Sequence, residues 1–167
     1  KPSALNFIVK TPLEHYVQVS SADFDSSGDY IGTEEYIILP EDKTSGYQIQ
    51  NLNVKGVATN GDYLTDTSYM FNGYNGLYLE LDYLNTSNVT NMNSMFRDSQ
   101  TTILDLSNFN TSNVTNMQNM FNRSQATTLD LSSFDTSNVT RMRDMFFYSQ
   151  ATKLDLSNFN TSSVTTM

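Results

Sequence analysis

The 167-residue chain contains no cysteine, no tryptophan and one histidine. The lack of cysteine excludes a disulfide framework, a thiol nucleophile and an Fe–S cluster, and a single histidine excludes a His-rich metal site. Nine Lys and Arg stand against 18 Asp and Glu, which gives a formal net charge of −9. Because nucleic-acid binding needs basic side chains, we expect no nucleic-acid partner. No apolar run approaches the roughly 20 residues of a membrane span, so we expect no membrane insertion in this segment.

Proline and glycine occur only in the N-terminal part of the chain, and methionine only from residue 70 onward. All three Pro and all seven Gly precede residue 77, whereas all eight Met follow residue 69. Short β-branched or aromatic runs, separated by Pro, Gly, Asp and Ser, occupy residues 6–10, 15–19, 36–39 and 47–49. These runs predict a small all-β N-terminal domain over residues 1–51.

From residue 52 onward the sequence repeats with a period of 25. The sequence LDLS at 104–107 recurs at 129–132 and 154–157, and LELD at 79–82 takes the same place one period earlier. The pattern divides the segment into a capping repeat at 52–76, full repeats at 77–101, 102–126 and 127–151, and a partial repeat at 152–167. Because a partial repeat would leave an apolar end uncovered, we expect the natural chain to continue.

Each repeat has one strand-like and one helix-like half. Apolar and polar residues alternate in LDLS, as in a half-buried strand. In the next segment Val114, Met117, Met120 and Phe121 have the spacing of one face of a short helix, and Thr111 or Ser112 is the expected N-cap. One strand and one short helix per 25 residues predict an α/β solenoid of leucine-rich repeats, preceded by the small β domain.

The sequence LDLSNFNTSNVTNMQNMF at 104–121 resembles the repeat of the BspA-type leucine-rich-repeat bacterial surface proteins. The resemblance covers roughly residues 62–167. It implies a secreted protein at the bacterial cell surface or cell wall, an adhesin that contacts a host or matrix protein, a mucin or a glycan. The alternative is a structural spacer that holds another domain away from the cell wall.

Two departures from these patterns concern particular positions. Asp98-Ser99, Arg123-Ser124 and Tyr148-Ser149 stand where the family often has Gly-Cys. The general leucine-rich pattern has an asparagine at one fixed position of every repeat, and these asparagines stack as a ladder. In this chain that position holds Leu or Phe, so a ladder would have to lie one residue later, at Asn85, Asn110, Asp135 and Asn160.

The outward positions of the predicted strands form the candidate binding face. Since the leucines of each LDLS point inward, the acid between them points outward, and the acids of successive repeats stack at a spacing of about 4.8 Å. The hypothesis is that this face grips an extended or basic partner through Tyr78, Glu80, Asp82, Ile103, Asp105, Thr128, Asp130, Lys153 and Asp155. Alternatively, the acids only keep the sheet soluble.

The sequence contains one candidate metal-binding loop and no catalytic motif. Asp23, Asp25, Ser27, Asp29 and Glu34 have the spacing of a calcium loop, although an acidic hairpin loop is the commoner explanation. There is no Gly-x-Ser-x-Gly elbow, and no motif surrounds any pair of carboxylates. We therefore expect no enzyme and no other cofactor.

Overall fold

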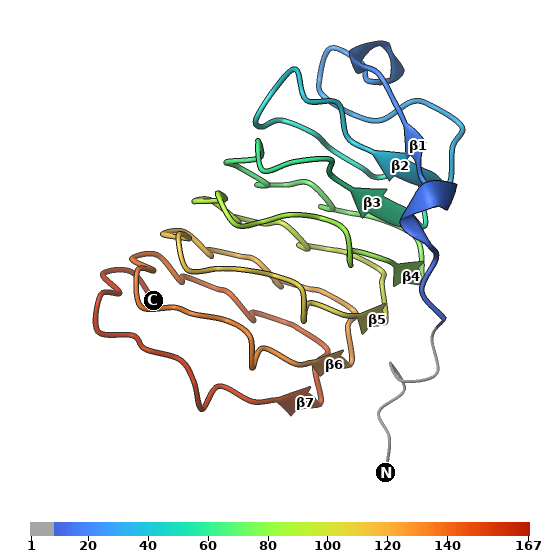
Figure 1. Ribbon diagram of the computed structural model, residues 1–167. Coiled ribbons are helices and arrows are strands. Elements are labelled where there is room, and N and C mark those ends of the chain that lie inside the picture. The colour runs from blue at the N-terminus through green and yellow to red at the C-terminus, as the bar shows by residue number, and fades with distance from the viewer. Residues whose placement is uncertain (1–8) are drawn as a thin grey trace.

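The structure is a computed structural model that describes residues 9–167. It contains two short parallel sheets, one formed by β1, β2 and β3 and the other by β4, β5, β6 and β7 (Figure 1). With η marking a 3-10 helix, the elements in chain order are η2 (Leu13–His15), β1 (Val17–Gln18), η3 (Ser21–Asp23), β2 (Tyr36–Ile38), β3 (Gly56–Ala58), β4 (Tyr78–Leu79), β5 (Ile103–Leu104), β6 (Thr128–Leu129) and β7 (Lys153–Leu154).

Successive repeats lie on one another in the register that the sequence period predicts. In the strands, Leu79 pairs with Leu104 and Leu129 with Leu154. On another side of each repeat a second series of parallel bridges joins residues that are again one period apart, namely Asp66, Asn91, Asn116, Arg141 and Thr166. Each repeat therefore makes one circuit and returns to the same place beside its neighbour (Figure 1).

The predicted α/β solenoid of strand-plus-helix leucine-rich repeats is wrong. The described residues form almost only sheet and turns, and their helices are η2 and η3, which both precede residue 24. In residues 114–121, where a helix face is expected, the chain makes a bridge at Asn116 and then turns from residue 118. Thr111 and Ser112 consequently cap no helix.

Hydrogen bonds between repeats explain the missing helix. An α-helix requires each N–H to bond the carbonyl four residues earlier. Instead, the N–H groups of Met117, Asn119 and Phe121 donate to carbonyls of the following repeat, 24 residues further on, each at 2.9 Å. Backbone groups that are bonded between repeats are not available to a helix within one repeat.

Left-handed backbone conformations accompany these bonds. Asn119 has φ of 57° and Arg123 of 58°, in the region that L-residues seldom occupy. The conformation recurs in the other repeats, at Tyr69, Ser94 and Asp144 in one column and at Gly73, Asp98 and Tyr148 in the other. Two such residues, four positions apart, interrupt any helix here.

Buried threonines tie each repeat to the next. The Thr111 hydroxyl accepts the N–H of Asp135 at 2.8 Å and donates to the carbonyl of the same residue at 3.0 Å. Thr86 and Thr136 make the same pair of bonds to Asn110 and Asn160. The side chains of the expected asparagine ladder instead accept an N–H two residues along their own loop. Threonine thus bonds across repeats beside the expected ladder positions, and a separate column of Asn88, Asn113 and Asn138 donates to carbonyls of the preceding repeat at 2.8 Å each.

One hydrophobic core runs the length of the repeats. Its most regular part is a column of stacked rings formed by Phe71, Phe96, Phe121 and Phe146, with centroids 5.5, 5.7 and 5.8 Å apart. The methionines beside them, from Met70 to Met145, are buried in the same core. The repeated Met-Phe pairs thus serve packing, which burial of apolar side chains favours by about 1.5–3 kcal/mol each.

The N-terminal part of the chain joins this core. β1 lies within the predicted run 15–19 and β2 within 36–39, whereas residues 47–49 contain only an isolated bridge at Gln48. The run at 6–10 lies largely outside the described residues. β3, which belongs to the predicted capping repeat, pairs with β2 through Val57 and Ile37. The division into a domain at 1–51 and repeats from 52 remains a prediction.

Candidate functional site

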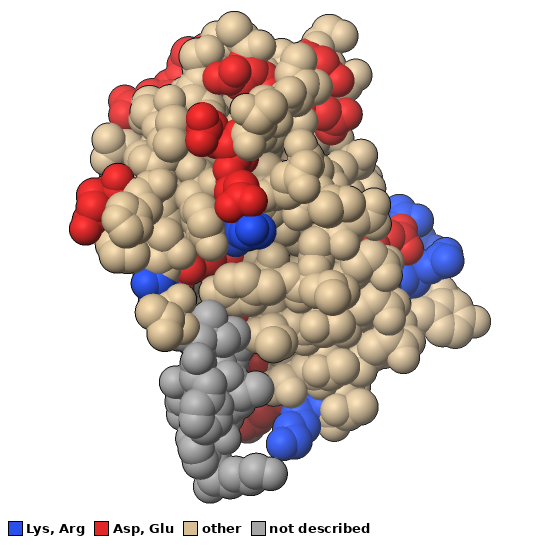
Figure 2. Space-filling view, turned by 90° about the vertical axis from the view of Figure 1, so that its right-hand side faces the viewer, with Lys and Arg blue, Asp and Glu red and all other residues tan. Residues whose placement is uncertain are grey.

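The strand face consists of the residues that point outward on and just after β4–β7. Tyr78, Ile103, Thr128 and Lys153 pair in register across the four strands. In the view of Figure 2, acidic side chains gather over the upper part of the molecule, and most of the remaining visible surface is uncharged. The structure thus brings the predicted site residues onto neighbouring strands.

The acids of this face are unequally exposed. Glu80 is only 2% exposed, Asp105 is half-buried, and Asp130 and Asp155 are exposed. The expectation that all four point into solvent is therefore wrong for Glu80. The exposed fraction of these acids thus increases from Glu80 to Asp105 and from Asp105 to Asp130 and Asp155.

The three aspartates also have a local structural role. Oδ1 of Asp105, Asp130 and Asp155 accepts the N–H two residues further on, at 3.0, 3.0 and 2.9 Å. Hydrogen bonds from Ser132 lower the pKa of Asp130, and those from Ser157 lower the pKa of Asp155. One oxygen of each carboxylate thus shapes the turn after the strand, and no protein hydrogen bond is recorded for the other among the described residues.

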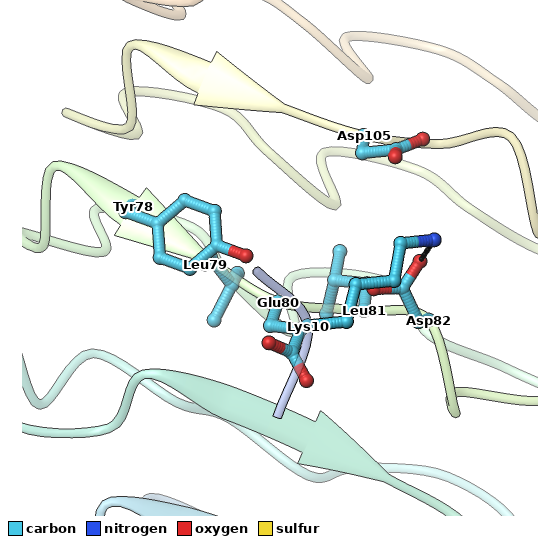
Figure 3. Close-up of a pocket in the computed structure, with 7 residues that line it drawn as sticks. All are labelled: Lys10, Tyr78, Leu79, Glu80, Leu81, Asp82 and Asp105. Carbon is cyan, nitrogen blue, oxygen red and sulfur yellow. Dashed lines mark hydrogen bonds and ion pairs between the residues drawn. The ribbon is translucent and has the colours of Figure 1, made fainter. Parts of the chain in front are cut away.

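The N-terminal segment covers Glu80. The Thr11 N–H donates to Oε2 of Glu80 at 3.0 Å, and the Tyr16 hydroxyl donates to Oε1 at 2.6 Å. Next to it, the Lys10 ammonium forms an ion pair of 2.8 Å with Asp82. Figure 3 shows Lys10 beside β4, with Asp105 just after the adjoining strand β5. This part of the face therefore holds a piece of the protein's own chain, which includes η2.

Aromatic packing fixes the position of Tyr16. Its ring meets Tyr36 and Tyr83 edge to face, with centroids 5.3 and 5.5 Å away. Gly56 makes room for it, because a Cβ there would lie 2.4 Å from the Tyr16 hydroxyl oxygen. Burial, followed by the hydrogen bond to Glu80, raises the pKa of the Tyr16 phenol, which therefore remains a donor at neutral pH.

Sequence reasoning missed the part that Lys10, Thr11 and Tyr16 play. A signal was present in the first full repeat. Glu80 stands where later repeats have Asp, and Asp82 stands where they have Ser. These are the two acids that hold the N-terminal segment.

The proposed calcium loop has a different arrangement. Asp25 Oδ1 accepts the N–H groups of Ser27 and Asp29 at 2.9 and 3.0 Å, and Asp23 accepts that of Ser20 at 2.8 Å. Over residues 9–167 no group of three or more His, Cys, Asp or Glu side chains is placed to hold a metal ion. These hydrogen bonds hold an acidic loop through its own backbone. Calcium binding by Asp23, Asp25, Ser27, Asp29 and Glu34 stays a prediction.

The architecture and the family match together define the class of this protein. Parallel pairing of 25-residue units, with one outward strand face, defines a tandem-repeat protein built on parallel sheet. The family model described as "Mycoplasma protein of unknown function, DUF285" matches residues 47–167, and the chain belongs to this family. Searches of curated proteins and of solved structures gave no match. In the part of the chain that is described, no helix has the length and apolar character needed to span a membrane.

Proposed function

We propose that this chain is a binding module of a bacterial surface protein, an adhesin whose strand face contacts an extended segment of a host or matrix protein, a mucin or a glycan. Membership of the repeat family and the resemblance of residues 104–121 to BspA-type repeats support a secreted protein at the cell surface or wall. Repeat proteins commonly bind along such continuous faces.

A single observation carries the proposal, namely the N-terminal segment seated on the strand face. Glu80 and Asp82 hold one backbone N–H, one hydroxyl and one ammonium of that segment. The hydrogen bond to Asp82 raises the pKa of Lys10, so the ammonium keeps its charge at neutral pH. The segment shows that acids of this face accept a backbone N–H, a hydroxyl and an ammonium from a chain that lies against them.

The partner's chemistry follows from the next acids along the face. Asp105, Asp130 and Asp155 continue the line from Glu80, and each uses one oxygen for its own turn. The remaining oxygen can accept a hydrogen bond from an ammonium, amide or sugar hydroxyl. An extended segment with such donors at the spacing of the strands fits this line best.

The test is an array of matrix proteins, mucins and glycans, probed with the protein and with a triple variant that combines Asp105→Asn, Asp130→Asn and Asp155→Asn. Asparagine keeps an Oδ1 acceptor for each turn, so the fold is retained while three charges are removed. Exposed charge pairs are worth about 0.2–1 kcal/mol each, so three account for about a 3- to 150-fold loss of affinity for a basic ligand.

A matched control changes the net charge equally at positions off the strand face, through Asp62→Asn, Asp98→Asn and Asp144→Asn. This control is expected to bind like the unaltered protein. Equal weakening by both triple variants would mean that net charge, and not this face, governs binding. If the unaltered protein bound nothing on the array, with or without calcium, the spacer would become the better explanation.

A further inference from the structure

Asparagine followed by glycine occurs three times in the chain, at residues 60–61, 72–73 and 75–76. In this dipeptide the backbone nitrogen of the glycine can attack the side-chain amide of the asparagine, because glycine has no side chain that hinders the approach. Asparagine is accordingly one of the thermolabile residues of proteins. Since the dipeptide is the same in all three places, the fold decides which of them reacts.

The fold blocks this reaction at Asn72. The Gly73 N–H donates to the carbonyl of Arg97 in the next repeat at 2.8 Å, so its nitrogen is occupied. Asn72 is half-buried, and its Oδ1 is a buried atom without a hydrogen-bond partner among the described residues. Gly73 has φ of 69° and belongs to the left-handed column that continues at Asp98 and Arg123. Attack at Asn72 therefore requires a bond between two repeats to open first.

The corner before β4 lacks a hydrogen bond that the same corner has in the later repeats. In those repeats a serine hydroxyl accepts the N–H two residues further on, at 3.3 Å; the serines are Ser99, Ser124 and Ser149. Tyr74 stands at the serine position of this corner, and its hydroxyl donates to the carbonyls of Val54 and Tyr78 instead. Within residues 9–167 no acceptor is recorded for the N–H of Gly76.

The side chain at this corner also differs from its equivalents. Later repeats have glutamine at the position of Asn75, namely Gln100, Gln125 and Gln150. Attack on a glutamine amide closes a larger ring, which forms less readily than the ring that an asparagine closes. Asn75 is exposed, so water reaches its amide. Asn75 thus combines a reactive side chain, a following glycine nitrogen without a recorded acceptor and access to water.

We propose that Asn75 is a site of self-modification, at which the chain converts this amide into a carboxylate with water as the only co-reactant. The Gly76 nitrogen gives its proton to solvent and bonds to Cγ of Asn75. The Cγ–Nδ2 bond breaks, and Nδ2 takes a proton from solvent and leaves as ammonia. Water then opens the resulting succinimide. Opening at Cγ gives aspartate, whereas opening at the backbone carbonyl carbon gives isoaspartate, whose main chain runs through Cγ.

The modification changes the corner that leads into the strand face. The Gly76 carbonyl accepts the hydroxyl of Thr101 at 3.0 Å, and the Leu77 carbonyl accepts the N–H of Thr102 at 3.0 Å. Directly after them, Tyr78 begins β4. Isoaspartate at position 75 lengthens the main chain just before these bonds, and either product adds one negative charge. The inference is independent of the binding function proposed for the strand face.

The test incubates the full 167-residue protein in mildly alkaline buffer made with water enriched in the heavy oxygen isotope. Trypsin then releases residues 56–97 as one peptide that contains all three dipeptides, and electron-transfer fragmentation distinguishes isoaspartate from aspartate at each position. We expect Asn75 to become a mixture of both products, each with solvent oxygen, at least about tenfold faster than Asn72, which local opening must first release. In urea the two rates should become similar, because the bond to Arg97 is lost.

The matched variant is Asn75→Gln, since glutamine stands at this position in three later repeats. It should keep the urea midpoint of the unaltered protein and carry no modification at position 75. Asn60 is the internal reference, because it is exposed and the Gly61 N–H has no acceptor recorded among the described residues. Asn60 should convert equally in both proteins.

Three results would overturn the proposal. The first is an unaltered Asn75 in folded protein whose Asn60 converts. The second is equal conversion of Asn72 and Asn75 in the folded protein, which would show that the bond to Arg97 and the open corner make no difference. The third is aspartate without isoaspartate at position 75, because that product indicates direct hydrolysis without attack by the Gly76 nitrogen.

Discussion

Replacing Thr111 by valine tests whether the buried threonines hold the repeats together. The Thr111 side chain is 1% exposed, and its hydroxyl makes two hydrogen bonds to Asp135 in the next repeat, at 2.8 and 3.0 Å. Valine has nearly the same shape, so the substitution removes both bonds without opening a cavity. The N–H and carbonyl of Asp135 lose their partner at the same time.

The magnitude follows from these two bonds. Each is worth about 0.5–1.5 kcal/mol net, and stranding their backbone partners adds to the loss, so we expect Thr111→Val to lower the free energy of unfolding by about 2–4 kcal/mol. Thr161 occupies the equivalent position in the last turn, where it is exposed and has no recorded hydrogen bond to a further repeat among the described residues. Thr161→Val should therefore change the free energy of unfolding by less than about 0.5 kcal/mol.

Equilibrium unfolding in urea, followed by circular dichroism and tyrosine fluorescence, gives both values. Thr111→Ser keeps the hydroxyl and is expected to retain most of the stability that Thr111→Val loses. If the two valine variants had the same effect, or if serine were as damaging as valine at position 111, the hydroxyl bonds would not be what joins the repeats, and the reasoning would fail.

Two other predictions concern the left-handed column and the strand face. Arg123→Gly should raise the free energy of unfolding relative to Arg123→Ala by about 1 kcal/mol, because only glycine adopts φ near 58° without strain; equal urea midpoints would contradict this. Hydrogen bonds from Ser132 lower the pKa of Asp130 in the folded protein. The ionised carboxylate therefore stabilises the fold at pH values above its pKa in the unfolded chain, near 4. This stabilisation is lost as the pH falls through the lower pKa of the folded protein. The urea midpoints of the unaltered protein and of the Asp130→Asn variant should therefore converge in acid. A difference that stayed constant with pH would contradict the stabilising role of this carboxylate.

The period of 25 and the buried leucines could be read directly from the sequence, because burial imposes a regular apolar pattern that survives whatever path the backbone takes. The absence of a helix from each repeat could not be read from the sequence. The spacing of Val114, Met117 and Met120 suits one face of a helix, yet the same three side chains are buried when the backbone makes turns. The pattern indicates which side chains face inward and leaves the partners of the N–H groups undetermined.

The candidate site was predictable to a similar extent. Alternation placed Asp105, Asp130 and Asp155 on one face, which the strand register supports. Burial of Glu80 by Thr11 and Tyr16 joins residues more than 60 positions apart. Nothing local to Glu80 reveals such a contact, apart from its difference from the aspartates of later repeats.

By itself the sequence determined the repeat length, the inward-facing residues and the order in which equivalent positions stack. Only the tertiary structure decided that backbone donors bond across repeats, that buried threonines rather than the residues at the expected asparagine positions make those side-chain bonds, and that the N-terminal segment covers one end of the strand face. The physical reason is that side-chain burial is periodic along the chain, whereas hydrogen bonds between repeats depend on which distant backbone groups the fold brings within 3 Å of one another.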